Sequence, residues 1–255
     1  MQLNVGVKEI PFGAAIDKLV VPEKLRLRIP TGYDIMDAAL GGKGMTPSVT
    51  TLFTGTPGAG KTTMLLMVAA AAARNGCCPV YNSAEESAYQ VKMVYERLLL
   101  HGSFGFGGET CAPRLLDKFT NLHAKSGNVN KHPLLIVDSL QTMHDGMDKS
   151  GRISNATGER VLEQITSWAK ETYSNAFVIG QVTKSGKAAG NNKLRHMVDA
   201  HIGITIDTDD RSPFYGSRKM KVFKNRFGPN GGVIFMRLEE TGFVELGRSD
   251  DDDED

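Results

Sequence analysis

The residues Gly55-Thr56-Pro57-Gly58-Ala59-Gly60-Lys61-Thr62 fill every fixed position of the pattern G-x-x-x-x-G-K-[ST]. An apolar, β-rich run precedes this stretch and an alanine-rich helical pattern follows it. In that setting the glycines let backbone N–H groups curl around phosphates at the start of the helix. A purely structural glycine turn is the alternative, and the context disfavours it. The residues expected around the phosphates are Gly55, Thr56, Pro57, Gly58, Ala59, Gly60, Lys61, Thr62 and Thr63.

This motif predicts ATP and Mg²⁺ as cofactors. Lys61 is expected to reach the β and γ phosphates, and the Thr62 hydroxyl is expected to bind the magnesium ion. The run 134–138 has the pattern of a buried strand and ends in Asp138, which would present a second acid to the metal. We therefore predict Thr62 and Asp138 as the metal-side residues.

Two adjacent acids, Glu85 and Glu86, follow the strand-like run 79–82. One of them could polarise the attacking water. Alternatively both could start the next helix, where acidic side chains favour the helix dipole. We expect one acid in each role.

Apolar β-rich runs alternate with helical patterns along the middle of the chain, which predicts an α/β fold with a mostly parallel sheet flanked by helices. Three later β-like runs joined by short loops predict antiparallel strands at one edge of that sheet. Ligands should gather at the carboxyl ends of the parallel strands. The expected strands are 49–54, 79–82, 134–138 and 176–181, the expected helices 62–74, 86–100 and 160–170, and the later runs 202–206, 219–223 and 233–237.

The composition is that of an ordinary globular protein: 40% of the 255 residues are hydrophobic and 23% are charged, which excludes disordered, collagen-like and coiled-coil chains. The longest apolar run, 64–73, is too short to span a bilayer. The first 30 residues lack the pattern of a signal peptide, so we expect a cytoplasmic protein without a membrane partner. Three cysteines without a C-x-x-C pair indicate neither a disulfide framework nor a zinc site.

We divide the chain into an N-terminal arm (1–30), a core (31–247) and an acidic tail (248–255). Prolines interrupt the arm, which is expected to pack on a neighbouring protomer. Within it, 12–15 has the form F-x-x-A by which some recombinases engage an adjacent protomer, although a locally packed Phe12 is the stronger interpretation. Residues 250–255 are all acidic, and without them the formal charge rises from +1 to +7. A basic protein with an acidic tail often binds polyanions.

Several motifs together resemble the bacterial RadA (Sms) branch of the RecA-like ATPases, over about residues 25–240. The most specific is Lys224-Asn225-Arg226-Phe227-Gly228, the K-N-R-F-G run that sets RadA apart within that superfamily. The other matching segments are 31–34, 39–42, the phosphate loop, 81–87, 138–142, 179–186 and 194–199.

The resemblance implies a RecA-like P-loop core that hydrolyses ATP in response to DNA, assembles as a hexameric ring and drives branch migration as a helicase in recombination and repair. By position, Glu85 resembles the catalytic carboxylate. Lys224 and Arg226 resemble the cations that a neighbouring subunit inserts at the γ-phosphate, although a phosphate-contacting or merely solvated loop is the alternative. Gln181 stands where the family usually has histidine, and it can still hydrogen-bond a γ-phosphate.

Other departures from the family pattern accompany the match. Ala84 replaces the usual glycine before the glutamate pair, and the four-cysteine zinc module and the Lon-protease-like domain are not in this sequence. We therefore expect a RadA ATPase core by itself, a compact version of the kind that phages could encode, whose origin the sequence leaves open.

Two basic segments follow the strands that end at Asp138 and Gln181, and the corresponding loops line the central channel of RecA-like rings. They are expected to follow the phosphates of single-stranded DNA without reading bases. Solvated surface loops are the alternative. The candidate DNA-binding residues are Lys149, Arg152, Lys184, Lys187, Lys193 and Arg195.

Two alternative functions stay open at this point, and so does the role of the tail. A RecA-like strand-exchange filament would use the same nucleotide site, and an ATP-gated KaiC-like binding or signalling module would move no DNA. The tail could compete with DNA for the channel, bind a basic partner, or only increase solubility. A recombinase is a further possible partner.

Overall fold

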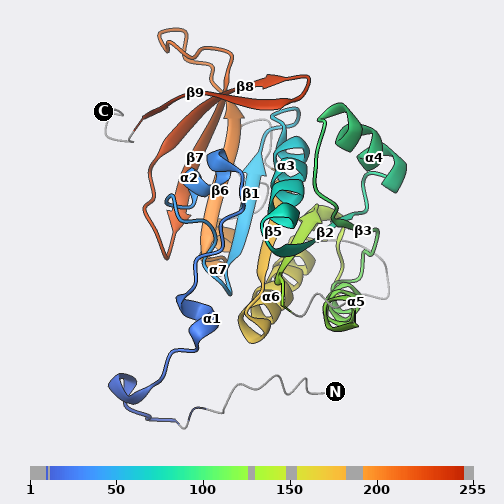
Figure 1. Ribbon diagram of the computed structural model, residues 1–255, viewed down its shortest axis with the longest axis vertical. Coiled ribbons are helices and arrows are strands. Elements are labelled where there is room, and N and C mark those ends of the chain that lie inside the picture. Colours follow the sequence, from blue (N-terminus) through green and yellow to red (C-terminus); the bar gives the residue numbers. More distant parts are fainter. Residues whose placement is uncertain (1–9, 11, 126–129, 148–153, 182–191, 250–255) are drawn as a thin grey trace.

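The computed structural model describes residues 10, 12–125, 130–147, 154–181 and 192–249. A nine-stranded sheet crosses this part of the molecule in the order β3-β2-β4-β5-β1-β6-β7-β8-β9 (Figure 1). The strands are β1 (Thr50–Gly55), β2 (Cys77–Ser83), β3 (Gly105–Gly107), β4 (His132–Asp138), β5 (Asn175–Gln181), β6 (Ala200–Ile206), β7 (Arg218–Asn225), β8 (Val233–Glu239) and β9 (Gly242–Ser249).

Helices pack on both faces of the sheet. The helices α2, α3 and α4 pack on one face, in a core with Phe53, Tyr81 and Phe177, and α5, α6 and α7 pack on the other face. None of the helices in the described ranges is long and apolar enough to cross a membrane. The helices are α1 (Glu23–Arg26), α2 (Asp34–Ala39), α3 (Lys61–Arg74), α4 (Ala88–Arg97), α5 (Ala112–Lys125), α6 (Asn155–Thr172) and α7 (Asn192–Met197), with 3-10 turns η1 (Ile16–Lys18) and η2 (Leu140–Thr142).

The predicted mixed sheet is confirmed, with one correction. The run 202–206 was expected to be antiparallel, but it forms β6, which pairs with β1 in parallel. Helix α7 provides the crossover from β5 to β6, and its six residues are too few to give a helical pattern in the sequence. Only β7, β8 and β9 are antiparallel to their neighbours.

Two elements near residues 105–125 were not predicted. Strand β3 is short and glycine-rich, so it lacks the β-branched composition of a strand. Helix α5 carries Pro113 at its second residue, and a proline there can be mistaken for a helix breaker although the first turn tolerates it.

The arm and the tail are described in part. Residues 10 and 12–28 form only η1, α1 and extended chain, and Phe12 is fully exposed at 108%. Strand β9 includes Arg248 and Ser249, which the sequence assigned to the tail. Residues 1–9 and 250–255 lie outside the described ranges.

We expect Phe53→Ala to destabilise the fold strongly. Phe53 lies in the middle of β1 with 0% of its side chain exposed, so the change leaves a cavity and should cost about 3–5 kcal/mol. Tyr89→Ala on α4, where the side chain is 83% exposed, should change stability by less than about 0.5 kcal/mol. Urea unfolding measures both, and equal midpoints for the two variants would contradict this view of the core.

Candidate nucleotide site

The carboxyl ends of four neighbouring parallel strands form the candidate site. Gly55 at the end of β1 lies beside Gln181 of β5, and Ser83 at the end of β2 lies beside Asp138 of β4. The chain reverses direction after each of these strands, so backbone and side chains from distant parts of the sequence meet at one edge of the sheet. This is where parallel α/β sheets bind ligands.

The phosphate loop joins β1 to α3 (Figure 1). Gly58 and Gly60 have φ values of 76° and 99°, in the left-handed region that favours glycine. A Cβ atom on Gly60 would also lie 2.6 Å from the ring of Phe243. No side chain caps the N-terminus of α3, so its first N–H groups can donate to an anion. The loop therefore fits the phosphates that its sequence predicts.

Lys61 is the first residue of α3, and its side chain folds back along the loop. Its Nζ donates hydrogen bonds to the carbonyl oxygens of Gly55 at 2.9 Å and Thr56 at 3.1 Å. Burial lowers the pKa of the ammonium, and the nearby carboxylates of Asp138 and Glu85 oppose that change. The cation thus lies between the phosphate loop and two acids.

Asp138 connects the loop to the neighbouring strands. Its Oδ2 accepts a 2.9 Å hydrogen bond from the hydroxyl of Thr62 and a second one from the hydroxyl of Tyr81. Burial raises the pKa of Asp138, although the bonds from Tyr81 and Thr62 lower it in part. A hydroxyl and a carboxylate side by side are oxygen ligands that suit Mg²⁺.

The donor set fits a metal shared with the substrate. No group of three or more His, Cys, Asp or Glu side chains that could hold a metal occurs among the described residues. Magnesium usually takes only one or two carboxylates and completes its coordination with water and phosphates. Thr62 and Asp138 would hold such an ion, which would neutralise charge on the phosphates.

The glutamate pair lies between β2 and α4. Glu85 Oε1 accepts a hydrogen bond from the hydroxyl of Ser139, while Ser83 Oγ accepts one from the N–H of Glu86 at 3.1 Å. Burial and the neighbouring Asp138 and Glu85 raise the pKa of Glu86.

The expectation that one of the two acids starts the next helix is wrong. Helix α4 begins at Ala88, and Ser87 caps it in a capping box with Gln90. This reciprocal cap pairs two backbone N–H groups at the start of the helix, one on Ser87 and one on Gln90. Glu85 and Glu86 both precede the cap, on the side of Asp138.

Lys224 and Arg226 lie at the opposite end of the sheet. Residue 225 pairs with Ala200 at the start of β6, whereas Gly55 pairs with Ile204 near its end. Four residues along a strand span about 13 Å, so these cations do not reach the phosphate loop of their own chain.

The two cations instead hold the junction between α7 and β6. Lys224 Nζ donates to the carbonyl oxygens of Val198 at 2.7 Å and Arg195 at 3.0 Å, and Arg226 pairs with Asp199 at 3.3 Å. The Arg226 side chain remains largely exposed.

The remaining predicted site residues, Gln181 and the DNA-binding candidates, do not form one cluster in the described residues. Gln181 places its backbone beside Gly55. Lys193 pairs with Glu159 of α6, and the guanidinium of Arg195 lies 5.5 Å from the centre of the Phe223 ring. The four remaining DNA-binding candidates, Lys149, Arg152, Lys184 and Lys187, lie outside the described residues.

The chain resembles curated RadA proteins in sequence. No protein-family model matches it. The chain is 34% identical to the DNA repair protein RadA of Aquifex aeolicus over 222 residues, which are 86% of the chain and 46% of that protein. It is 34% identical to RadA of Mycobacterium tuberculosis over 216 residues, 84% of the chain and 42% of that protein. This chain is a homologue of the RadA proteins. It spans less than half the length of these RadA relatives.

Solved structures show the same fold at low sequence identity. A solved ATPase domain matches with a TM-score of 0.73 at 14% identity, over 88% of the chain and 93% of that domain. A DnaB-like replicative helicase matches with a TM-score of 0.72 at 14% identity, over 86% of the chain and 62% of the helicase. A KaiC-like protein of Pyrococcus horikoshii gives 0.66 at 15%, over 86% and 99%. The chain therefore has the RecA-like P-loop fold that these solved structures share.

Two residues of the site were not assigned a role from the sequence. Tyr81 donates to Asp138, and Ser139 donates to Glu85. Tyr81 lies in the middle of a buried strand, where the sequence pattern indicates a core aromatic residue. Ser139 directly follows the metal-side acid, and this adjacency is the only signal for it in the sequence.

We expect Asp138→Asn to stabilise the nucleotide-free protein, increasingly so as the pH rises. Because the folded-state pKa of Asp138 is raised, the native state binds more protons than the unfolded chain above the ordinary pKa, and stability falls as the pH rises through that window. Asparagine does not titrate. In urea unfolding, the advantage of D138N should be larger at about pH 8 than at about pH 5.

Asp145→Asn provides a control of opposite sign. The hydrogen bond from Arg160 lowers the pKa of Asp145, so its ionised form stabilises the fold at neutral pH and D145N should destabilise it. A D138N protein less stable than the wild type at about pH 8 would contradict the prediction for Asp138.

Proposed function

We propose that the chain is a Mg²⁺-dependent ATPase of RadA type that acts on DNA in recombination and repair. The observation that carries this proposal is the arrangement of Lys61, the Thr62–Asp138 pair and Glu85 around one phosphate loop. A cation, a metal-side pair and an acid beside the γ-phosphate position are the parts that phosphoryl transfer to water requires.

Each of these side chains has a distinct role in the proposed hydrolysis. Lys61 offsets charge on the β and γ phosphates, and Glu85 orients the attacking water and accepts its proton. Ser139 fixes Glu85 by donating to one carboxylate oxygen. Tyr81 and Thr62 favour the ionised form of Asp138, which the metal requires. Gln181, at the end of β5 beside the loop, is proposed to sense the γ-phosphate.

Two features support action on DNA by an assembly. RadA relatives carry the name DNA repair protein, and a replicative helicase shares the fold. The arm exposes Phe12, Ile16 and Val20, apolar side chains that a neighbouring copy would cover. We propose a ring, hexameric as the resemblance implies, that moves along single-stranded DNA as a helicase. Lys149, Arg152, Lys184, Lys187, Lys193 and Arg195 stay the proposed channel residues.

We further propose that Lys224 and Arg226 complete the nucleotide site of the adjacent subunit. They lie at the end of the sheet opposite their own phosphate loop, so stacking one copy on the next in a ring can bring them to a neighbour's γ-phosphate. A cation supplied in this way is worth about 10³–10⁵ in rate. Hydrolysis would then depend on assembly.

Glu85→Gln should abolish most hydrolysis while nucleotide still binds. The amide keeps the size of the side chain but cannot accept a proton, so the rate should fall by about 10²–10⁴. Steady-state phosphate release and binding of a fluorescent ATP analogue measure the two effects. Glu86→Gln, one residue on, is the matched control and should retain most activity. A fully active E85Q would remove Glu85 from the mechanism.

Mixing two inactive variants tests the proposed contribution between subunits. Lys61→Ala lacks the nucleotide-site lysine, and Lys224→Ala lacks the cation for its neighbour, so each alone should lose about 10³ or more in rate. In mixed assemblies, a Lys224→Ala site next to a Lys61→Ala subunit regains both groups. ATP hydrolysis, measured with and without single-stranded DNA, should therefore reappear on mixing.

A double variant, Lys61→Ala with Lys224→Ala, provides the control. Mixed with the Lys61→Ala protein, it leaves no site with a lysine in the loop and should restore nothing. Because Lys224 also holds the end of α7, its loss could damage only its own chain. In that case mixing would fail to restore hydrolysis, and the contribution between subunits would be disproved.

A further inference from the structure

Among the described residues, no helix covers one face of the antiparallel part of the sheet. Along β7, Met220 and Val222 point into the core beside α3, so Lys219, Lys221 and Phe223 point to the other face. The helices that cover that other face pack mainly against the parallel strands. We call the surface formed by Lys219, Lys221, Phe223 and Arg195 the β7 face.

Phe223 is the centre of the β7 face. Its ring is 45% exposed and stacks on the buried imidazole of His201, with ring centres 4.9 Å apart and planes 21° apart. The Nε2 of His201 hydrogen-bonds the hydroxyl of Thr54 at 2.8 Å, which fixes the imidazole. A Cβ on Gly203 would lie 2.5 Å from the Phe223 ring, so glycine leaves the room in which the ring lies flat. Packing against His201 and Gly203 thus holds the inner face of the Phe223 ring in place.

Two cations lie over this ring. The Arg195 guanidinium is 5.5 Å and the Lys221 ammonium 5.8 Å from its centre. One position earlier on the same face, Lys219 lies 5.9 Å from the ring of Phe235. The acids of the loop 207–217 lie at the end of β7 away from Phe223, where Asp209 interacts electrostatically with Lys219. Two cationic side chains, those of Arg195 and Lys221, therefore lie at the exposed ring itself.

We propose that the β7 face binds single-stranded DNA, with a base stacked on Phe223 and the adjoining phosphates on Lys219, Lys221 and Arg195. This inference rests on the proposed action on DNA and extends the proposed channel surface from Arg195 to Lys219, Lys221 and Phe223, which the channel assignment does not include. An aromatic ring backed by a rigid support, with cations beside it, is the combination that binds single strands without reading sequence.

The position and spacing of the β7 face support this occupant. Successive side chains on one face of a strand are about 6–7 Å apart, so Lys219, Lys221 and Phe223 form a line along which an extended strand can run. Arg195 belongs to α7 and is itself one of the proposed channel residues, so it connects the β7 face to the proposed channel. Two of the three cations are lysines, a residue type that is depleted in protein–protein interfaces, which disfavours a protein as the partner.

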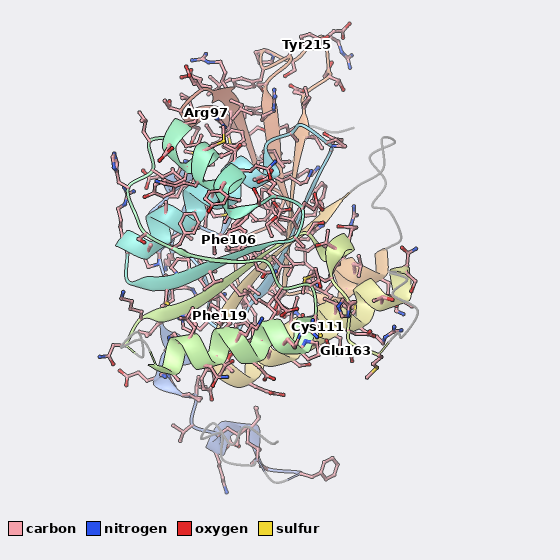
Figure 2. All side chains as sticks on the ribbon, turned by 90° about the vertical axis from the view of Figure 1, so that its right-hand side faces the viewer. Arg97, Phe106, Cys111, Phe119, Glu163 and Tyr215 are labelled. Atoms are coloured by element: carbon pink, nitrogen blue, oxygen red, sulfur yellow. The ribbon has the colours of Figure 1, made fainter. Side chains whose placement is uncertain are left out.

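The test is the affinity of the full chain for a fluorescently labelled oligo(dT), measured by anisotropy without nucleotide. Phe223→Ala removes the stacking surface and should weaken binding about 5- to 100-fold. Phe223→Tyr keeps a ring and should bind as the wild type does. Phe106→Ala is the matched control, because Phe106 is 40% exposed on β3 at the other end of the sheet, where Figure 2 labels it, and it should leave affinity unchanged.

Stacking itself has a spectroscopic signature. The chain has a single tryptophan, Trp168, which is buried between α5 and α6. Phe223→Trp therefore adds a surface fluorophore whose emission oligo(dT) should quench, whereas the wild-type emission should change little. Quenching absent from Phe223→Trp at a concentration that saturates binding would overturn the proposal.

The cations are tested through salt dependence. Lys221→Gln should lower the slope of log affinity against log salt by about 0.7, because one phosphate contact is lost. Lys92→Gln is the control, since Lys92 pairs with Glu96 on α4 far from the face, and its slope should equal that of the wild type.

The outcomes separate this inference from the proposed function. If the wild type binds oligo(dT) and Phe223→Ala binds equally well, the β7 face is not the binding surface, while action on DNA stands. If Phe223→Ala changes the oligomer size in light scattering and leaves oligo(dT) affinity unchanged, the face is a protein interface and the proposal fails. If the wild type neither binds oligo(dT) nor hydrolyses ATP faster with it, the proposed function fails first.

Discussion

The buried carboxylate of Asp138 is the constraint on which the nucleotide site depends. Removing an ionised acid from water is costly unless hydrogen bonds or charges replace the lost solvation. Here Thr62 and Tyr81 donate to the same oxygen, and Lys61 supplies charge nearby. These partners come from the phosphate helix and from β2, so compensating one charge also fixes the loop against two strands. The site is thereby held in position before any nucleotide binds.

These partners do not fully offset the cost of burying the acids. The pKa of Asp138 stays raised, and so does that of Glu86 beside it. A cation at this position would relieve both acids at once. If a metal binds with the nucleotide as proposed, these two acids would favour it, because ligands that bind the folded state stabilise it.

The sequence predicted the features that local chemistry determines. The phosphate loop, Asp138 and the alternation of strands and helices each depend on a short pattern, and the fold and the RadA relationship are confirmed. What it missed depends on contacts between distant residues. The parallel pairing of β6 depends on a crossover whose helix, α7, has only six residues, and the support of Phe223 by His201 joins β7 to β6 across a sheet pairing. Tyr81 looked like a core residue because its hydroxyl partner lies on another strand.

The two ends of the sheet carry different chemistry for a topological reason. Parallel strands all place their carboxyl ends at one edge, which gathers Lys61, Glu85 and Asp138 there. Strand β7 is antiparallel to β6, so its carboxyl end, with Lys224 and Arg226, lies at the opposite end of the sheet, beside the amino end of β6. One chain therefore holds the acids and the candidate cations on opposite sides and cannot combine them by itself. Under the proposal that Lys224 and Arg226 act at a neighbouring nucleotide site, the acids and the cations would meet only between two copies, and an assembly in which each copy presents its β7 end to the next phosphate loop is the simplest arrangement that brings them together.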